Sequence, residues 1–563
     1  MSLWPRLRSR RLPVVRRDEG GGGRVRLAMV CFTLLFVVIG GRLVYLGFTD
    51  LPPSAAWRSA QDAVAATRPD ILDRNGEILA TDIRSVSLFA EPRKVVDADE
   101  AVELLSTILP DLGNADTRHK LASKAGFVWL KRELSPSLER PIHDLGLPGV
   151  GFLVEKQRFY PGGAVAGHIM GLVNIDNQGI AGVERTIDGR GLSDLHALGF
   201  AQTRNLEPVR LSIDLRVQHV VRDELARAME RYRAIAAIGI VLDVDTGEVV
   251  AMHSLPEVDP NIPSQALEKD RMNRATAGVF EMGSVFKMFT IASALEAGVA
   301  TMTSTVDASR PISIGRHTIR DFHGKGRVLN IPEVFIYSSN IGTGRLALQL
   351  GPTRQQQFFR DFGFLGKLKT DIPEVGAPIV PGSWKEITAV TTSFGHGLSV
   401  SPMQTAAAGA ALVNGGRYIP PTFFARTRAE ADQVTTRVVS EETSQSMRTM
   451  FRMNVEKGSG RRAEVKGYFV GGKTGTAEKV VGGRYSKEKN LNSFLAAFPM
   501  DKPRYLVLVV VDEPKPDPKT GGGRTAGMNA APTVSAIIRR AGPLLGVEPR
   551  FRDPAAGPLL VSY

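Results

Sequence analysis

The sequence predicts an α/β protein in which helices pack on an antiparallel sheet, preceded by a smaller α+β module and one N-terminal membrane helix. Three observations predict it. An apolar segment lies close to the N-terminus, strand-like segments stand at both ends of the second half, and an apolar helical segment lies between them. At 563 residues the chain is too long for one hydrophobic core, so we expect two or more domains.

The composition is that of a globular protein, with 43% hydrophobic and 23% charged residues. The formal net charge is +13, and residues 1–26 alone hold eight arginines. No basic module interleaved with aromatic residues follows, so the charge favours a membrane flank over nucleic-acid binding. The single cysteine, Cys31, excludes a disulfide framework, and the histidines show no H-E-x-x-H spacing. We expect no metal and no cofactor.

The segment Leu27–Phe48 predicts a retained membrane anchor. It holds 15 uncharged residues, then Arg42, then six more uncharged residues, 22 in all. An arginine near one end can extend its side chain to the interface, and the arginines before the segment place the N-terminus in the cytoplasm. A cleaved signal peptide is the alternative. The long charged leader and the absence of an A-x-A site after Phe48 favour the anchor.

The first half after the anchor shows no complete catalytic constellation. Its segment Asp70–Asp82, "DILDRNGEILATD", predicts a β-hairpin that turns at Asn75-Gly76. Residues 98–145 favour helix, and the glycine-rich segment Arg158–Gly189 is mixed. We therefore expect a non-catalytic module here.

The second half begins near Val209 with a strand, "VRLSID", and an amphipathic helix, "LRVQHVVRDELARAMERY". A hairpin follows, in which "AAIGIVLDV" and "EVVAMHS" flank Asp245-Thr246-Gly247. Near the far end, "NSFLAAFP" and "RYLVLVVVDEP" predict two strands, the second so apolar that we expect it at the centre of a sheet. "APTVSAIIRRAGPLL" then closes as a helix. This order predicts one α/β domain whose antiparallel sheet is assembled from distant segments.

A serine and a lysine lie one turn apart at the start of a helix that is apolar on all sides, "GSVFKMFTIASALEAGV", so we expect the helix to be buried. Ser284 and Lys287 are neighbours on its first turn. A lysine buried there has a lowered pKa, and once neutral it can accept the proton of the serine. A second S-x-x-K, Ser486 to Lys489, lies in a charged, loop-like stretch where nothing desolvates the lysine.

Two further motifs follow in order. "YSSN" contributes Ser338 and Asn340, and "GGKTGTAE" contributes Lys473, Thr474, Gly475 and Thr476. Together the motifs form the S-x-x-K, S-x-N and K-T-G set of serine β-lactamases and penicillin-binding proteins. A second K-T-G at Lys519 is surrounded by prolines and glycines, so we expect a mobile surface loop with a solvated lysine. The first copy can form a strand beside the Ser284 helix.

With these motifs the sequence resembles the class B transpeptidases of the penicillin-binding protein family over nearly the whole chain after the anchor. The likeness includes "DRNGEILA", "RFYPGGAVAGHIMG" and "GHGLSVSPMQ", and "DNQGIAGVE" is similar to the septal, FtsI-type branch. It implies a penicillin-binding/serine β-lactamase-like transpeptidase domain, an antiparallel sheet with helices, on an elongated α+β pedestal. His396 departs from the pattern, where glutamine is expected, and this affects the nearby wall of the site.

The resemblance implies a peptidoglycan D,D-transpeptidase that cross-links stem peptides through an acyl-enzyme during septal cell-wall synthesis. It implies inhibition by β-lactams and a possible D-Ala-D-Ala carboxypeptidase side activity. Ser284 would attack the carbonyl of the penultimate D-alanine, and Lys287 would act as the general base. Ser338 would relay a proton to the leaving D-alanine.

The other motif residues have implied binding roles. Asn340 would hold Lys287 and the substrate backbone, and Lys473 would keep the site positive. Thr474 and Thr476, on either side of Gly475, would bind the terminal carboxylate of the substrate. The backbone N–H groups of Ser284 and Thr476 would form the oxyanion hole.

The resemblance also implies a domain order and a location. The expected domains are a cytoplasmic basic tail at 1–26, the transmembrane anchor at 27–48, a pedestal or dimerisation-type domain at 49–205, the transpeptidase domain at 206–550 and a C-terminal tail at 551–563. We expect a single-pass inner-membrane protein with a periplasmic catalytic domain. Expected partners are stem peptides ending in D-Ala-D-Ala, β-lactams, a septal SEDS-family glycosyltransferase of the FtsW type and other divisome membrane proteins, but no nucleic acid.

Alternatives stay open from the sequence. "GYFVGGKT", Gly467–Thr474, fits the P-loop pattern of an ATPase, and "YLVLVVVDE" resembles its Walker B strand. Against this, Tyr468–Val470 falls inside the expected loop and Gly482-Gly483 would end any following helix. A non-catalytic division scaffold and an elongation-type transpeptidase are further alternatives, although all motif residues are intact. A soluble β-lactamase would explain neither the pedestal nor the anchor.

Overall fold

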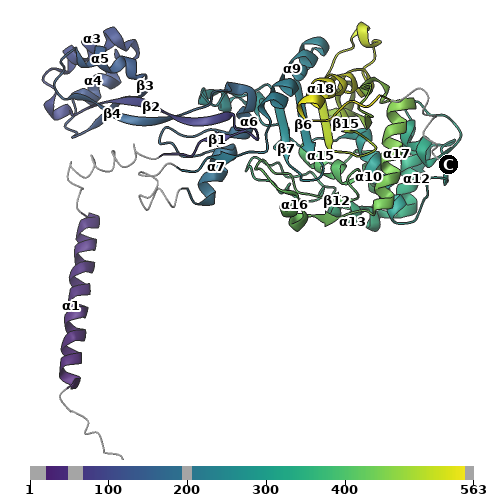
Figure 1. The fold of residues 1–563 in the computed structure, drawn as a ribbon, viewed down its shortest axis with the longest axis horizontal. Helices are drawn as coiled ribbons and strands as arrows, with labels where there is room; N and C mark the ends of the chain where they lie inside the picture. Colours follow the sequence, from purple (N-terminus) through teal and green to yellow (C-terminus); the bar gives the residue numbers. More distant parts are fainter. Residues whose placement is uncertain (1–20, 49–66, 193–205, 552–563) are drawn as a thin grey trace, which may run out of the picture. The chain divides into compact units, whose positions relative to one another are not determined.

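The computed structural model describes residues 21–48, 67–192 and 206–551 (Figure 1). The helix α1 covers Gly21–Phe48 and contains the segment predicted to be an anchor. Within the described ranges, no helix combines the length and the apolar run that crossing a membrane requires. Most of the basic tail at 1–26, and all but the first residue of the tail at 551–563, lie outside the described residues.

The chain forms two compact units. The first joins Met1–Val64 with Ser87–Leu153, and the second joins Ala65–Val86 with Val154–Tyr563. In the first unit the helical tendency predicted for 98–145 is confirmed by three helices. They are α3 (Ala98–Ile108), α4 (Ala115–Leu121) and α5 (Glu139–His143).

The strand β3 (Val128–Leu134) lies between these helices and was missed by the sequence prediction. Its residues Lys131, Arg132 and Glu133 favour helix when read alone. Pairing with the neighbouring strand β2 (Ile78–Ala90) overrides that local preference. The strand β4 (Val150–Phe159) passes from the first unit into the second.

The predicted hairpin near the start of the second unit is confirmed. β1 (Ile71–Leu72) pairs antiparallel with β2, with Ile71 opposite Ala80. The Asp73 carboxylate accepts the N–H groups of Asn75 at 2.7 Å and Glu77 at 2.9 Å, which closes the turn. Gly76 has φ +94°, a conformation that favours glycine.

The main sheet of the second unit has five strands in the order β14-β15-β16-β6-β7, all antiparallel. In this order the strands are β14 (Gly471–Val481), β15 (Arg484–Phe498), β16 (Tyr505–Asp512), β6 (Ala236–Asp243) and β7 (Val249–Leu255). β16 is central and buried along its whole length, as its apolar sequence predicts. The sheet therefore joins the two ends of the second half of the chain.

The two faces of this sheet carry different helices. Val507, Val509 and Val511 of β16 pack with α9 (Leu215–Tyr232) and α18 (Ala530–Leu544), which lie together in Figure 1. Leu506, Leu508 and Val510 point to the other face, into the core that holds α10 (Lys287–Glu296) and α15 (Pro402–Ala411). This alternation follows from the two-residue period of a strand.

The predicted helix at 215–232 is confirmed with the same bounds. Asp214 precedes it, and its carboxylate accepts the N–H of Arg216 at 3.0 Å, as expected of an N-cap. The predicted strand "VRLSID" is too long, because β5 covers only Val209–Arg210. The Ser212 N–H donates instead to the Phe423 carbonyl at 2.9 Å, which leads the chain away from the strand.

A segment between α10 and the following helices, here called the 305–330 excursion, contains two pairs of short antiparallel strands, one enclosed within the other along the chain. β8 (Thr305–Asp307) pairs with β11 (Val328–Asn330), and β9 (Ile312–Ile314) pairs with β10 (His317–Ile319).

Further helices and strands of the second unit are α6 (Gly167–Met170), α7 (Gly182–Ile187), α11 (Ile331–Ile336), α12 (Asn340–Leu350), α13 (Pro352–Asp361), α14 (Glu386–Ser393), β12 (Arg417–Tyr418), α16 (Arg428–Val434), β13 (Thr436–Arg437) and α17 (Glu441–Lys457).

The second copies of two motifs lie away from any buried site. Ser486 belongs to β15, so the prediction of a loop there is wrong, but Lys489 is exposed as predicted and lies 3.7 Å from the Glu513 carboxylate. Lys519 lies in a short 3₁₀ turn, Pro518–Thr520, and is exposed. The mobility predicted for that turn stays a prediction.

The P-loop alternative is wrong. A P-loop needs a helix that begins at its lysine. Here Lys473 and Thr474 lie inside the strand β14, which continues to Val481. The backbone therefore cannot form the phosphate-binding turn.

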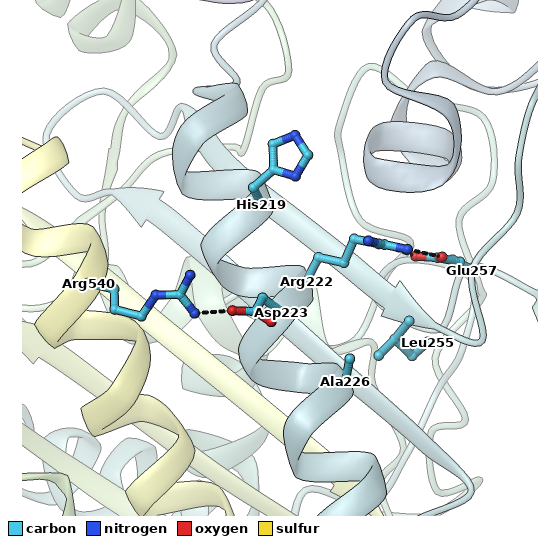
Figure 2. A pocket seen from close by; sticks show the side chains of 7 residues that line it. All are labelled: His219, Arg222, Asp223, Ala226, Leu255, Glu257 and Arg540. Atoms are coloured by element: carbon cyan, nitrogen blue, oxygen red, sulfur yellow. Dashed lines mark hydrogen bonds and ion pairs between the residues drawn. The ribbon is translucent and has the colours of Figure 1, made fainter.

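One pocket of about 420 Å³ lies on the outer side of α9, beside α18 (Figure 2). Its charged side chains are paired with one another: Arg222 donates to Glu257 at 2.5 Å, and Arg540 contacts Asp223. The lining residues are His219, Arg222, Asp223, Ala226, Leu255, Glu257 and Arg540. No predicted site residue is among them, because α9 and α10 cover opposite faces of the sheet.

Candidate active site

Ser284 lies in a 3₁₀ turn, Gly283–Phe286, that leads directly into α10. The turn and β14 lie so close together that each has a glycine at the point of contact, Gly283 in the turn and Gly475 in the strand. A Cβ on Gly283, whose φ is +56°, would lie 2.7 Å from the Thr476 carbonyl oxygen, and one on Gly475 would lie 2.5 Å from the Met282 carbonyl oxygen. The prediction that the first K-T-G forms a strand beside the serine is confirmed.

Lys287 is buried, with 1% of its surface exposed, at the first residue of α10. Its Nζ atom lies 3.0 Å from Ser284 Oγ and 3.0 Å from Ser338 Oγ, and it donates to the Ser338 carbonyl oxygen. Ser338 ends the turn after α11 with φ +57°, a conformation rare for residues other than glycine. The structure thus brings the serines of the first two motifs to one amine.

Lys473, on β14, reaches the same hydroxyl. Its side chain is fully buried, and Nζ donates to Ser338 Oγ at 3.0 Å and to the Thr474 carbonyl oxygen at 3.3 Å. The ring of Phe335 lies 5.7 Å from Nζ. Two lysine amines therefore share one serine oxygen in a site largely closed to water.

Burial lowers the pKa of Lys287 well below its ordinary value, and the charge of Lys473 lowers it further, whereas Asp321 raises it. Burial also lowers the pKa of Lys473, to about 7. Two ammonium groups on one hydroxyl repel each other, so one lysine is neutral when the other is charged. The pKa of Lys287 is lowered by burial and by the charge of Lys473 together, which favours a neutral amine beside Ser284.

The hydrogen bonds of Lys287 fit a neutral amine, which has two N–H groups and one lone pair. One N–H must point to the Ser338 carbonyl oxygen, because that atom can only accept. The second N–H can point to Ser338 Oγ, which leaves the lone pair facing the Ser284 hydroxyl. This arrangement can remove the proton of Ser284.

Asn340 begins α12 close to these groups, but its amide is turned elsewhere. Its Nδ2 atom donates to the Arg320 carbonyl oxygen at 3.0 Å. The described polar contacts of Lys287 go to Ser284 and Ser338, so the implied contact between Asn340 and Lys287 stays a prediction.

The threonines of the third motif bind neighbours that carry no sequence signal. Thr474 Oγ1 lies 2.7 Å from Ser459 Oγ, and Thr476 Oγ1 accepts the Ala526 N–H at 3.1 Å. Ser459 and Ala526 follow no recognisable pattern, and tertiary contact alone reveals them. Both threonine hydroxyls lie on the K-T-G strand next to the serine turn.

The wall that contains His396 is aromatic. Its ring stacks on Tyr485 with centroids 5.2 Å apart and an angle of 19°, and burial together with the charge of Lys287 lowers its pKa to about 4. His396 is therefore neutral near pH 7. Glu281, three residues before the nucleophile, accepts the Gly397 N–H at 2.8 Å and the Tyr485 hydroxyl at 3.1 Å. Sequence reasoning missed Glu281 and Tyr485.

Two family models match the chain. The penicillin-binding protein transpeptidase domain matches residues 237–539, and the penicillin-binding protein dimerisation domain matches residues 63–189. A protein of Caulobacter vibrioides described as a probable peptidoglycan D,D-transpeptidase FtsI is 41% identical over 505 residues, which cover 86% of this chain and 82% of that protein. The peptidoglycan D,D-transpeptidase FtsI of Escherichia coli K12 is 30% identical over 563 residues, covering 93% and 92% of the two chains.

Solved structures show the same likeness. The transpeptidase domain of penicillin-binding protein 3 from Burkholderia pseudomallei is 34% identical with a TM-score of 0.54, and the match covers 61% of this chain and 98% of that one. Penicillin-binding protein 3 from Mycobacterium tuberculosis, complexed with ampicillin, is 25% identical with a TM-score of 0.66, covering 87% and 97%. The chain belongs to the penicillin-binding protein transpeptidase family, as a class B member of the septal, FtsI-type branch.

Proposed function

We propose that this peptidoglycan D,D-transpeptidase cross-links stem peptides through an acyl-enzyme on Ser284. One observation carries the residue assignment. The buried Lys287 Nζ lies 3.0 Å from both Ser284 Oγ and Ser338 Oγ, and Lys473 Nζ also lies 3.0 Å from Ser338 Oγ. These contacts connect the proposed nucleophile, neutral base, proton relay and second amine in one hydrogen-bonded chain.

In the acylation step, Ser284 Oγ attacks the carbonyl carbon of the penultimate D-alanine of a stem peptide. The Ser284 proton passes to Lys287 Nζ, and negative charge develops on the carbonyl oxygen. The N–H groups of Ser284 and Thr476 are the proposed donors to that oxygen, each worth roughly 3 kcal/mol in such sites. The amide C–N bond then breaks, and the leaving nitrogen takes a proton through Ser338. The products are an ester on Ser284 and free D-alanine.

The substrate ends in a carboxylate, and the third motif offers the groups to bind it. The hydroxyls of Thr474 and Thr476 can donate to the carboxylate oxygens, and Lys473 supplies positive charge beside them. Since the pKa of Lys473 is about 7 in the free site, an arriving anion favours its ammonium form. Charge on Lys473 in turn favours neutral Lys287.

In the second step an amine of a neighbouring stem peptide attacks the ester carbonyl. The amine loses a proton, the ester C–O bond breaks, and Ser284 Oγ is protonated again. The product is the cross-linking amide. Water in place of the amine gives the carboxypeptidase side reaction.

Mass spectrometry of the full chain after incubation with a penicillin tests this function. A β-lactam acylates the same serine, so the expected result is one adduct, located on the peptide that contains Ser284. An adduct on any other residue, or none at all, would reject the assignment and favour the non-catalytic scaffold.

We also propose that the chain is a single-pass inner-membrane protein with domains at 1–26, 27–48, 49–205, 206–550 and 551–563. The family matches fall inside the third and fourth ranges, which supports these boundaries. Large apolar side chains of α1 between Leu27 and Ile39 are exposed, as suits contact with lipid. The partners fitting this location are a septal FtsW-type glycosyltransferase and other divisome membrane proteins.

A reporter that is active only outside the cytoplasm tests this topology. Fused after Phe48, the reporter is expected to be active, and fused after Arg26, before the anchor, it is expected to be inactive. The reverse pattern would place the catalytic domain in the cytoplasm and contradict the proposal.

A further inference from the structure

The 305–330 excursion holds the loop of the second motif at three successive residues. The Asp321 carboxylate accepts the Ser339 hydroxyl at 2.7 Å through Oδ2 and the Ile341 N–H at 2.9 Å through Oδ1. The carbonyl oxygen of the preceding residue, Arg320, accepts the Asn340 amide at 3.0 Å. Two adjacent residues of the excursion therefore fix the backbone and side chains between Ser338 and α12.

These contacts act on a strained piece of backbone. Ser338 has φ +57°, and a residue with a side chain stays in that conformation only where its surroundings hold it. The Ser339 hydroxyl donates to Asp321 and accepts the Gly342 N–H at 2.9 Å, so the same oxygen caps α12. By fixing the start of α12, the carboxylate also fixes the Ser338 hydroxyl and carbonyl oxygen that contact Lys287.

Asp321 also belongs to the charges that surround Lys287. Lys473 on β14 lowers the pKa of Lys287, and Asp321 raises it. His396, from the loop after α14, faces the same amine but is neutral near pH 7 because its pKa is about 4. Asp321 is therefore the negative charge that opposes Lys473.

We propose that Asp321 is a positioning residue for acyl transfer, which fixes the loop Ser338–Asn340 against Lys287 and balances the positive charge of Lys473. The proposal rests on the proposed function, since it concerns the same site. Its consequence is that the excursion, which contains none of the three motifs, is needed for the second motif to be aligned.

The test compares Asp321→Asn with Asp307→Asn in the full chain. Asp307 lies in the same excursion and is exposed, and its carboxylate accepts the Ser309 N–H at 2.9 Å rather than any group of the site. Both variants lose one negative charge. The readouts are the rate of penicillin acylation between about pH 5 and 9, and the melting temperature.

Asparagine keeps the shape of Asp321 but cannot accept both hydrogen bonds, so the maximal acylation rate is expected to fall at least ~10-fold relative to Asp307→Asn, as for a misplaced catalytic group. Loss of the negative charge lowers the pKa of Lys287, so the acid limb of the rate profile should move to lower pH, by about one unit. A variant that is only less stable would not move that limb in this direction.

A maximal rate within twofold of Asp307→Asn would overturn the proposal, and so would a reduced rate with an acid limb that stays in place or moves to higher pH. If Asp321→Asn does not fold, the acylation rate of the Ser339→Ala variant tests the proposal instead. That variant loses the hydroxyl that donates to Asp321 but keeps the Asp321 carboxylate. Its acylation rate is expected to fall, while the acid limb of its rate profile stays at the same pH. An unchanged acylation rate would overturn the proposal. Failure of the unsubstituted chain to react with penicillin would count against the proposed function instead.

Discussion

Replacement of Ser284 by alanine is expected to abolish both the penicillin adduct and the release of D-alanine from a stem peptide. Ser284 Oγ lies 3.0 Å from the buried Lys287 amine in the turn that leads into α10, and alanine leaves no oxygen to form the ester. The fold should persist, because Ser284 is only half-buried and the turn depends on Gly283. Intact mass and D-alanine release measure the two losses.

The matched control is Ser486→Ala, the serine of the second S-x-x-K. Its lysine, Lys489, is exposed and lies 3.7 Å from the Glu513 carboxylate, so this pair lacks the buried amine that Lys287 provides beside Ser284. This variant should form the adduct at the rate of the unsubstituted chain. If the adduct were retained in Ser284→Ala and lost in Ser486→Ala, Ser486 rather than Ser284 would be the nucleophile.

Replacement of Lys287 by arginine is expected to slow acylation by at least ~10³-fold, within the range that general bases contribute. Arginine keeps a positive charge and cannot release its proton near neutral pH, so Ser284 loses its base. In the unsubstituted chain the neutral form of Lys287 is the active one. Acylation should therefore rise with pH through the lowered pKa of Lys287 and fall below it. Stopped-flow acylation across the pH range measures both effects.

The control for this substitution is Lys489→Arg, which changes an exposed lysine of β15 in the same way. Its acylation rate should match that of the unsubstituted chain. A Lys287→Arg variant that acylates within tenfold of the unsubstituted chain would show that another group takes the serine proton.

The sequence predicts those parts of the fold whose local pattern agrees with their burial. The helix at 215–232, the hairpin of β6 and β7, and the central strand β16 have clear periodicity or near-continuous apolar residues. β3 could not be predicted in this way, because its charged residues favour helix and its pairing with β2 decides the outcome. The same holds for the outer part of β15, whose polar sequence resembles a loop but pairs with β14.

The residues of the site also fall into those that the sequence predicts and those that it does not. Ser284, Lys287, Ser338 and Lys473 belong to motifs whose order could be recognised, and the structure brings them together. Asp321, Ser459 and Tyr485 approach them from segments with no such pattern. Their contacts depend on where the excursion, the loop after α17 and the outer hairpin of the sheet lie, and only the tertiary fold determines that.

The strand order of the main sheet has a consequence for how the protein reaches its native state. β16 pairs with β6 along its whole length, although the paired residues are roughly 270 positions apart along the chain, so the sheet closes through contacts of very long range. As the chain is synthesised from its N-terminus, the Ser284 helix emerges well before β14, β15 and β16, and until they arrive its apolar surface has no complete sheet to cover it. Such a chain exposes hydrophobic surface while it waits, as large proteins with distant strand pairing do. A newly made molecule thus passes through a stage in which it is inert toward its substrate and vulnerable to aggregation and proteolysis, and it leaves that stage when β14, β15 and β16 have joined the sheet.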